Sequence, residues 1–169
     1  YIEKNLSKIT AFSVTDHPEV WLHLILRSAQ NKVDVVSEDQ LEKGVRATLN
    51  FGHTIGHAIE AAFDYKTFLH GEAVALGMKA AGYLSVSQKK MTKKDYERLL
   101  ALLEDCGFPL TLPPIDPQKL LDIIYSDKKV HLGQIRFVLA TGIGGTEIVD
   151  NIQDTDIIKA IQTLLPLES

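Results

Sequence analysis

The fold of this chain is decided by the stretch Arg46-Ala-Thr-Leu-Asn-Phe-Gly-His53-Thr-Ile-Gly-His57-Ala-Ile-Glu60 and by the segment Leu69-His70-Gly-Glu72 that follows it. His53 and His57 are four residues apart, the spacing that places two side chains on one face of a helix. His70 follows after a short loop, at the start of the next helical pattern. Imidazole nitrogen is a common ligand of zinc and similar ions. The spacing therefore predicts a metal site between two neighbouring helices.

Apolar residues recur at helical spacing along most of the chain. The expected helices run from Pro18 to about Val36, through the histidine stretch, over 71–86, from Thr92 to Gly107, from Asp116 to about Ser126, and from about Asp154 to Leu165. We expect Asp16 to cap the first of these, and Thr92 to cap the helix that it begins. The segment 71–86 is rich in Ala and Gly, which predicts a helix packed closely against the histidine helix.

One β element is expected near the carboxyl end. The segments 134–140 and 146–149 flank the glycine-rich turn Gly142-Ile-Gly-Gly145, a pattern typical of a β-hairpin. This turn is not a dinucleotide fingerprint, because no strand-turn-helix setting surrounds it. The expected fold class is therefore mainly α, a helical array with a small β-hairpin.

Length and composition limit the class of protein. A chain of 169 residues with 45% hydrophobic residues fits one domain with a single core, over residues 1–169. The formal net charge of -4 disfavours a nucleic acid or an anionic membrane surface as partner. No apolar run is long enough to span a membrane, and no signal pattern opens the chain, so we expect a cytoplasmic location. The lone Cys106 excludes an internal disulfide.

Polar side chains recur at helical spacing up to and through the histidines. Arg46, Asn50, His53 and His57 stand at positions i, i+4, i+7 and i+11, which on one helix would form a continuous stripe. Such a stripe is either a solvated face or the wall of a pocket. Solvated faces favour Lys and Glu over Asn and His, so we favour the pocket. Its cationic groups suit a small polyanion that carries carboxylate or phosphate.

Other candidates add less on their own. Two helix histidines at this spacing are often structural. Thr54 stands where a zinc peptidase has its glutamate and could not serve as the general base, which disfavours that class. Lys128 and Lys129, expected in a loop before the hairpin, are either phosphate-binding or solvated. Lys32 and Glu42 are polar groups on or beside apolar helices and join the candidate pocket.

Four segments together resemble one known family. They are Lys32-Val-Asp-Val-Val-Ser-Glu-Asp, the stretch from Gly44 to Glu60, Leu69-His-Gly-Glu-Ala-Val-Ala-Leu-Gly-Met78, and Asp127-Lys-Lys129. In order and content they resemble the carboxy-terminal domain of the 3-dehydroquinate synthase family, within the sugar-phosphate cyclases. The fold that this resemblance implies is a helical metal- and substrate-binding domain that follows an NAD-binding α/β domain. We expect that amino-terminal domain to be absent from this chain, which begins at Tyr1 in a helical pattern.

The resemblance implies a function and cofactors. Members of the family use NAD and a divalent metal, Zn²⁺ or another such as Co²⁺, to convert 3-deoxy-arabino-heptulosonate 7-phosphate into 3-dehydroquinate and phosphate. This lyase reaction belongs to the shikimate pathway of aromatic amino acid biosynthesis. The implied partners are the sugar-phosphate substrate, the NAD-binding domain of the same protein and a second copy in a homodimer. Without the NAD-binding domain, the chain is expected to be inactive.

The resemblance also implies a role for each motif residue. His53 and His70 would be metal ligands, with a third ligand, a glutamate, in a segment before this chain. Arg46, Asn50 and Lys32 would contact the substrate carboxylate and hydroxyls. His57 and one of Lys128 or Lys129 would contact phosphate, and Glu42 matches an active-site position.

Other functions stay open at this point. A sibling cyclase could act on a heptulose phosphate without a carboxylate, although Arg46, Asn50 and Lys32 together favour a carboxylated substrate. The metal-dependent alcohol and glycerol dehydrogenases share the architecture and the paired-histidine helix. A non-catalytic oligomerisation module would keep the motif as scaffold and would need no ion.

Overall fold

The computed structural model describes residues 1–41, 44–129 and 135–166, with the side chains of residues 127–129 outside the description. The described elements are η1 (Glu3–Asn5), α1 (Leu6–Thr10), α2 (Pro18–Glu38), η2 (Val45–Asn50), α3 (His53–Ala62), α4 (His70–Ser87), α5 (Lys93–Asp105), α6 (Pro117–Lys129), β1 (Arg136–Gly142), β2 (Gly145–Asp150) and α7 (Asp154–Gln162). The prediction of a mainly helical array with one hairpin is confirmed.

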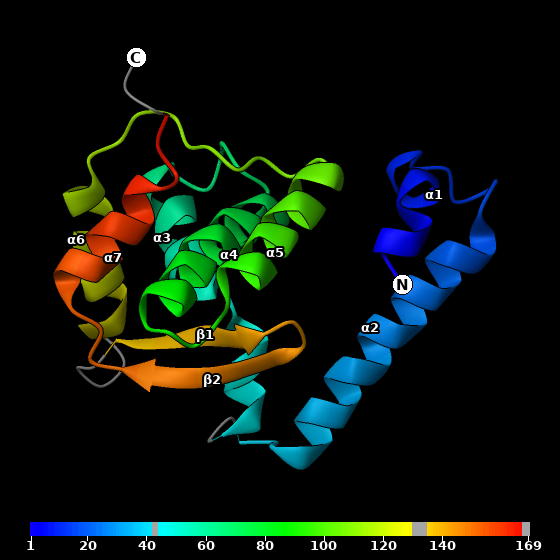
Figure 1. Ribbon diagram of the computed structural model, residues 1–169, viewed down its shortest axis with the longest axis horizontal. Coiled ribbons are helices and arrows are strands. Elements are labelled where there is room, and N and C mark those ends of the chain that lie inside the picture. The colour runs from blue at the N-terminus through cyan, green and yellow to red at the C-terminus, as the bar shows by residue number, and fades with distance from the viewer. Residues whose placement is uncertain (42–43, 130–134, 167–169) are drawn as a thin grey trace.

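Helix α4 lies at the centre of the main body (Figure 1). It contacts α3, α5, α7 and β1, while α6 packs against both α3 and α7. Apolar side chains from five of these elements form one core, and the largest fully buried ones are Ile55, Ile59, Leu76, Leu84, Leu120, Leu121, Ile124, Phe137, Leu139, Ile157 and Ile161. This core fixes the relative positions of α3 and α4, the two helices that carry the histidines.

Strands β1 and β2 form the predicted antiparallel hairpin, with Phe137 opposite Val149 and Leu139 opposite Glu147. A buried hydroxyl joins the hairpin to α4. Ser85 is fully buried, accepts a hydrogen bond from the Ala140 backbone N–H at 2.9 Å and donates one to the Ala81 carbonyl at 2.7 Å. The edge of β1 is thereby paired with a helix side chain, which satisfies a backbone donor that burial would otherwise leave unpaired.

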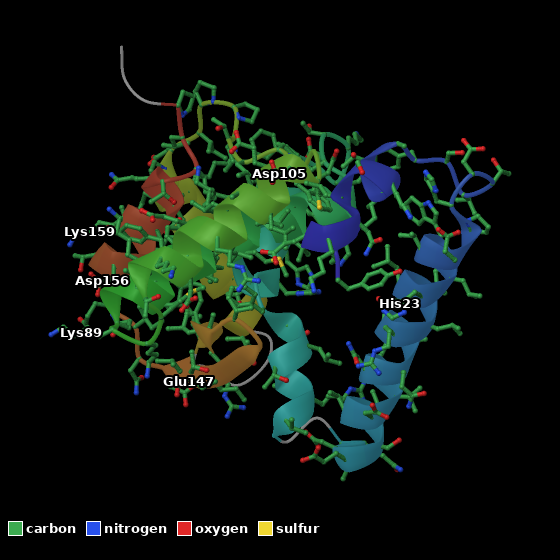
Figure 2. All side chains as sticks on the ribbon, turned by 45° about the vertical axis from the view of Figure 1, so that its right-hand side comes forward. His23, Lys89, Asp105, Glu147, Asp156 and Lys159 are labelled. Atoms are coloured by element: carbon green, nitrogen blue, oxygen red, sulfur yellow. The ribbon has the colours of Figure 1, made fainter. Side chains whose placement is uncertain are left out.

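Helix α2 runs apart from the main body (Figure 1), and Figure 2 shows His23 on its amino-terminal half. Of the residues of α2, only Val20 is buried, whereas Leu22, Ile25, Leu26 and Val33 are more than half exposed. Pro18 opens this helix as expected. The prediction that Asp16 caps it is wrong: His17 is the N-cap residue, and the Asp16 carboxylate accepts a hydrogen bond from the Ser13 hydroxyl at 2.6 Å instead.

Two further expectations need correction. The segment that contains Lys128 and Lys129 was expected in a loop, but its backbone continues α6 to its last residue, Lys129. The short helix η2 ends at Asn50, and α3 begins only at His53. None of the described helices is both long enough and apolar enough to cross a membrane.

Candidate metal centre

The site begins at a helix crossing that has no room for side chains. Gly52 precedes α3 with a φ of +83°, and a Cβ there would lie 2.7 Å from the Met78 backbone nitrogen. A Cβ on Gly77 of α4 would lie 1.9 Å from the Gly52 carbonyl oxygen. Glycine is therefore required at both positions, because no other residue allows the backbones to come so close. The predicted close packing of the Ala- and Gly-rich helix on the histidine helix is confirmed.

This crossing places the amino-terminal residue of α4, His70, beside the histidines of α3. The ring centroids lie 5.5 Å apart for His53 and His57, 5.4 Å apart for His53 and His70, and 5.8 Å apart for His57 and His70. One ring nitrogen from each histidine lies within 4.8 Å of the others. We call these three residues, His53, His57 and His70, the histidine cluster.

The histidine cluster fits a divalent metal ion. Two nitrogens bound to one tetrahedral zinc ion are separated by about 3.4 Å, so modest side-chain rotation would bring these atoms to ligand distance. His53 is half-buried, whereas His57 and His70 are exposed, which leaves one side of the cluster open. An open side is what a catalytic ion needs in order to bind water or substrate.

Partial burial also favours the form of His53 that binds metal. Desolvation lowers the pKa of His53, and repulsion from His57 and His70 lowers it further, against an opposing hydrogen bond to Phe51. The Nδ1 atom of His53 lies 3.4 Å from the Phe51 carbonyl oxygen, a long hydrogen bond. Neutral imidazole is the ligand form, so a lowered pKa favours metal binding at neutral pH.

The continuous stripe expected from Arg46 to His57 is wrong. Arg46 and Asn50 lie on η2, and the left-handed Gly52 interrupts the helix before His53. The tight 3-10 turns of η2 also change the angular spacing of its side chains. The four residues therefore do not share one face of one helix.

The remaining predicted site residues lie on several elements. Lys32 lies on the exposed surface of α2, which contacts η2. Arg46 donates a hydrogen bond from Nη1 to the Gln40 carbonyl oxygen at 3.0 Å. Glu42 and the side chains of Lys128 and Lys129 lie outside the described residues.

Two residues of this region had no predicted role. The Asp39 carboxylate accepts hydrogen bonds from the backbone N–H groups of Gly44 at 2.7 Å and Arg46 at 3.1 Å, and so orders the start of η2. Glu60 contacts His70, with both carboxylate oxygens 3.2 and 3.3 Å from Nδ1. A sequence separation of ten residues gives no helical-spacing signal for that contact.

A separate cavity lies away from the histidine cluster. A space of about 540 Å³ separates η1 and α2 from α5 and the hairpin turn, and its walls, which include Leu24, Leu99 and Ile143, are mainly apolar. None of the described candidate residues lines this cavity. The candidate metal ligands lie at the open histidine cluster and not in this apolar cavity.

Comparison with known proteins matches this arrangement to one family. The family described as 3-dehydroquinate synthase C-terminal matches residues 1–130, which include all three histidines. The chain belongs to the 3-dehydroquinate synthase C-terminal family. Within this family, 3-dehydroquinate synthase from Nostoc punctiforme is 45% identical over 145 residues, which is 85% of this chain and 40% of the relative. The enzyme of the same name from Desulforamulus reducens is 38% identical over 162 residues, 95% of this chain and 44% of the relative. The chain thus spans about two fifths of the length of these relatives.

Solved structures show the same fold. The 2-epi-5-epi-valiolone synthase of Streptomyces hygroscopicus, with NAD+ and Zn2+ bound, matches 85% of this chain and 39% of its own, with a TM-score of 0.75 and 24% identity. A 2-deoxy-scyllo-inosose synthase, complexed with carbaglucose-6-phosphate, NAD+ and Co2+, matches 79% of this chain and 39% of its own, with a TM-score of 0.70 and 29% identity. The dehydroquinate synthase-like fold of the C-terminal family is therefore confirmed.

Proposed function

We propose that this chain is the metal- and substrate-binding domain of a 3-dehydroquinate synthase, which converts 3-deoxy-arabino-heptulosonate 7-phosphate into 3-dehydroquinate and phosphate. The observation that carries the proposal is the histidine cluster, which lies within the matched residues 1–130. The relatives that share 38–45% of their aligned residues with this chain carry that enzyme name. The whole enzyme would be a cytoplasmic homodimer in which an upstream domain holds NAD.

His53 and His70 would hold the divalent ion, Zn²⁺ or Co²⁺, and a glutamate from the upstream part would complete its ligands. When bound, the ion supplies Lewis-acid polarisation of a substrate oxygen, and NAD supplies reversible hydride transfer. The half-exposed cluster leaves room for the substrate beside the ion. Neutral His53, favoured by its lowered pKa, would keep its lone pair available at neutral pH.

The cationic residues of this chain would bind the anionic ends of the substrate. Arg46 and Lys32 would pair with the carboxylate and neighbouring hydroxyls, and Asn50 would exchange hydrogen bonds with a hydroxyl. His57 and one of Lys128 or Lys129 would hold the phosphate group, and Glu42 would complete the pocket. Fixing both ends of one substrate positions it for several successive steps in a single site.

The test is phosphate release from the heptulosonate 7-phosphate by the full-length protein supplied with NAD and Zn²⁺. We expect turnover by the wild type, a loss of at least about 100-fold in His53→Ala, and wild-type rates in His23→Ala, whose ring stacks on Tyr1 and lies outside the cluster. A second arm offers a heptulose 7-phosphate without the carboxylate. Preference for that substrate would replace the proposal with a sibling cyclase, the class to which the structural neighbours belong by name.

A further inference from the structure

Glu60 and His70 form a contact between two helices. Glu60 lies in α3 and His70 begins α4, and both Glu60 oxygens are within hydrogen-bond distance of His70 Nδ1, at 3.2 and 3.3 Å. The Glu60 side chain is only 12% exposed, whereas that of His70 is 58% exposed. A carboxylate so far removed from water is stable only when it accepts hydrogen bonds, so the pairing with the ring N–H is favoured.

The contact determines which nitrogen of His70 is available. A neutral imidazole carries one proton, and the nitrogen that does not carry it has the lone pair that binds metal. A carboxylate accepts and does not donate, so Glu60 selects the form in which Nδ1 is protonated. The Nε2 atom, on the far side of the ring from Nδ1, then holds the lone pair.

The Glu60 carboxylate does not belong to the group of atoms that could bind a metal ion directly. Among the described residues, the group whose ligand atoms lie within 4.8 Å of one another contains His53, His57 and His70 but not Glu60. Imidazole ligands such as His53 and His70 bring no negative charge to a divalent ion, and a carboxylate behind one of them offsets part of the ion's charge.

We propose that Glu60 is a positioning residue, which holds His70 in the tautomer that presents Nε2 to a metal ion at the histidine cluster. The inference rests on the proposed metal centre. Partners of this kind behind a ligating histidine raise its basicity and fix its ring, and their loss typically weakens metal binding by about 10–100-fold.

The first measurement is Co²⁺ affinity of the metal-free full-length protein, by competition with a chelator and by the visible absorption of the bound ion. Glu60→Ala should bind Co²⁺ about 10–100-fold more weakly than the wild type, and Glu60→Gln, whose amide oxygen still accepts the hydrogen bond, should lose less. Equal affinity in wild type and both variants would overturn the inference. A different coordination number in Glu60→Gln would also overturn it, since Glu60 would then be a ligand.

The second measurement reads the tautomer directly. In metal-free protein labelled with ¹⁵N-histidine, His70 should be protonated at Nδ1 in the wild type and should lose that fixed tautomer in Glu60→Ala. The matched control is Glu72→Gln, at the same end of α4, where the carboxylate accepts a hydrogen bond from the Leu69 backbone N–H at 2.8 Å. That variant should lower thermal stability and keep the His70 tautomer; loss of the tautomer there as well would make the effect of Glu60 merely structural and overturn the inference.

The two proposals fail in different ways. If His53→Ala abolishes Co²⁺ binding while the Glu60 variants bind as the wild type does, the metal centre stands and the role of Glu60 is wrong. If the wild type and His53→Ala bind Co²⁺ equally weakly, the metal centre is wrong, and the inference falls with it.

Discussion

Two histidines one turn apart differ in their surroundings. His53 is the first residue of α3, is half-buried, and has a pKa lowered chiefly by desolvation. His57 is exposed on the next turn, although its ring nitrogen belongs to the same cluster. Desolvation favours the neutral ligand form at His53, whereas the exposed His57 ring is accessible from solvent and can donate a ring N–H to a phosphate oxygen. The two residues are therefore expected to serve different parts of the site.

Alanine substitutions of His53 and His57 should distinguish a metal ligand from a phosphate contact. In the full-length protein, His53→Ala should weaken Zn²⁺ binding by more than about 100-fold, because it removes a ligand. His57→Ala should keep the affinity for Zn²⁺ within about threefold and should instead raise the KM for the phosphorylated substrate. Metal titration and steady-state kinetics on the same preparations measure both quantities. Loss of the metal in both variants would make His57 a third ligand.

A half-buried phenol on α5, that of Tyr96, predicts a pH effect on stability. Desolvation, helped by the neighbouring Tyr83, raises the pKa of Tyr96 to about 12. In the unfolded chain this phenol titrates near pH 10, so between about pH 10 and 12 the folded state binds more protons. Tyr96 therefore contributes stability that is fully present below about pH 10 and is lost as the pH rises toward 12.

Urea unfolding at about pH 9 and about pH 11 tests this effect. Tyr96→Phe should lose less stability over that interval than the wild type, because its ring has no proton to lose. Tyr65→Phe, at a phenol that is 70% exposed, should behave as the wild type. Parallel losses in all three proteins would show that Tyr96 titrates normally.

At the scale of secondary-structure elements, the site depends on the crossing of α3 and α4. Gly52 lies against Met78, Gly56 against Ala73, and Glu60 against His70, so the two helices run in opposite directions. This antiparallel contact brings the first residue of α4 to the histidines of α3.

Gly77→Ala tests the crossing. The added Cβ would meet the backbone of Gly52 at 1.9 Å, and a backbone cannot move aside as a side chain can. We expect a loss of about 3 kcal/mol or more in the free energy of unfolding, together with weaker metal binding as α3 and α4 separate. The control is Gly71→Ala in the same helix, where the nearest atom is 4.0 Å away in the Phe108 ring. That variant should be neutral or more stable by up to about 1 kcal/mol, because alanine favours the helix, and a similar loss in both would contradict the packing argument.

The elements themselves were largely predictable, because their signals are local. Thr92 accepts a hydrogen bond from the Asp95 backbone N–H at 3.1 Å, so it caps α5 as expected. The break before α3 was not predictable in this way. It depends on the left-handed Gly52, which the sequence shows only as one glycine among several, and on the contact of that glycine with α4.

The same distinction holds within the site. His53, His57 and His70 stand out in the sequence by residue type and spacing, and the structure brings them together. The contact between Glu60 and His70 arises from the packing of two helices, so no spacing rule reveals it. The roles of Lys32, Arg46 and Asn50 remain predictions.

At the scale of the whole molecule, α2 contrasts with the main body. Its apolar residues Leu22, Ile25 and Leu26 are exposed, whereas α4 is packed by other elements along its length. A helix with few buried apolar contacts opens locally at low free energy.

The rates of backbone amide hydrogen exchange in the 169-residue chain should therefore differ between helices. Amides of α4 should exchange most slowly, near the rate of global unfolding, and amides of α2 should exchange much faster. Under the proposed function, the same measurement on the full-length protein should show slower exchange in α2, because a further domain of the proposed enzyme would cover its apolar side chains. Equal protection of α2 and α4 in the short chain would contradict the arrangement.

The most direct test of the metal centre is anomalous diffraction near the zinc absorption edge, from crystals of the full-length protein grown with Zn²⁺. We predict one strong peak at the histidine cluster, about 2.0–2.1 Å from a ring nitrogen of His53 and from one of His70. A fully occupied zinc ion elsewhere in the molecule, with none at the cluster, would contradict the assignment of His53 and His70 as metal ligands.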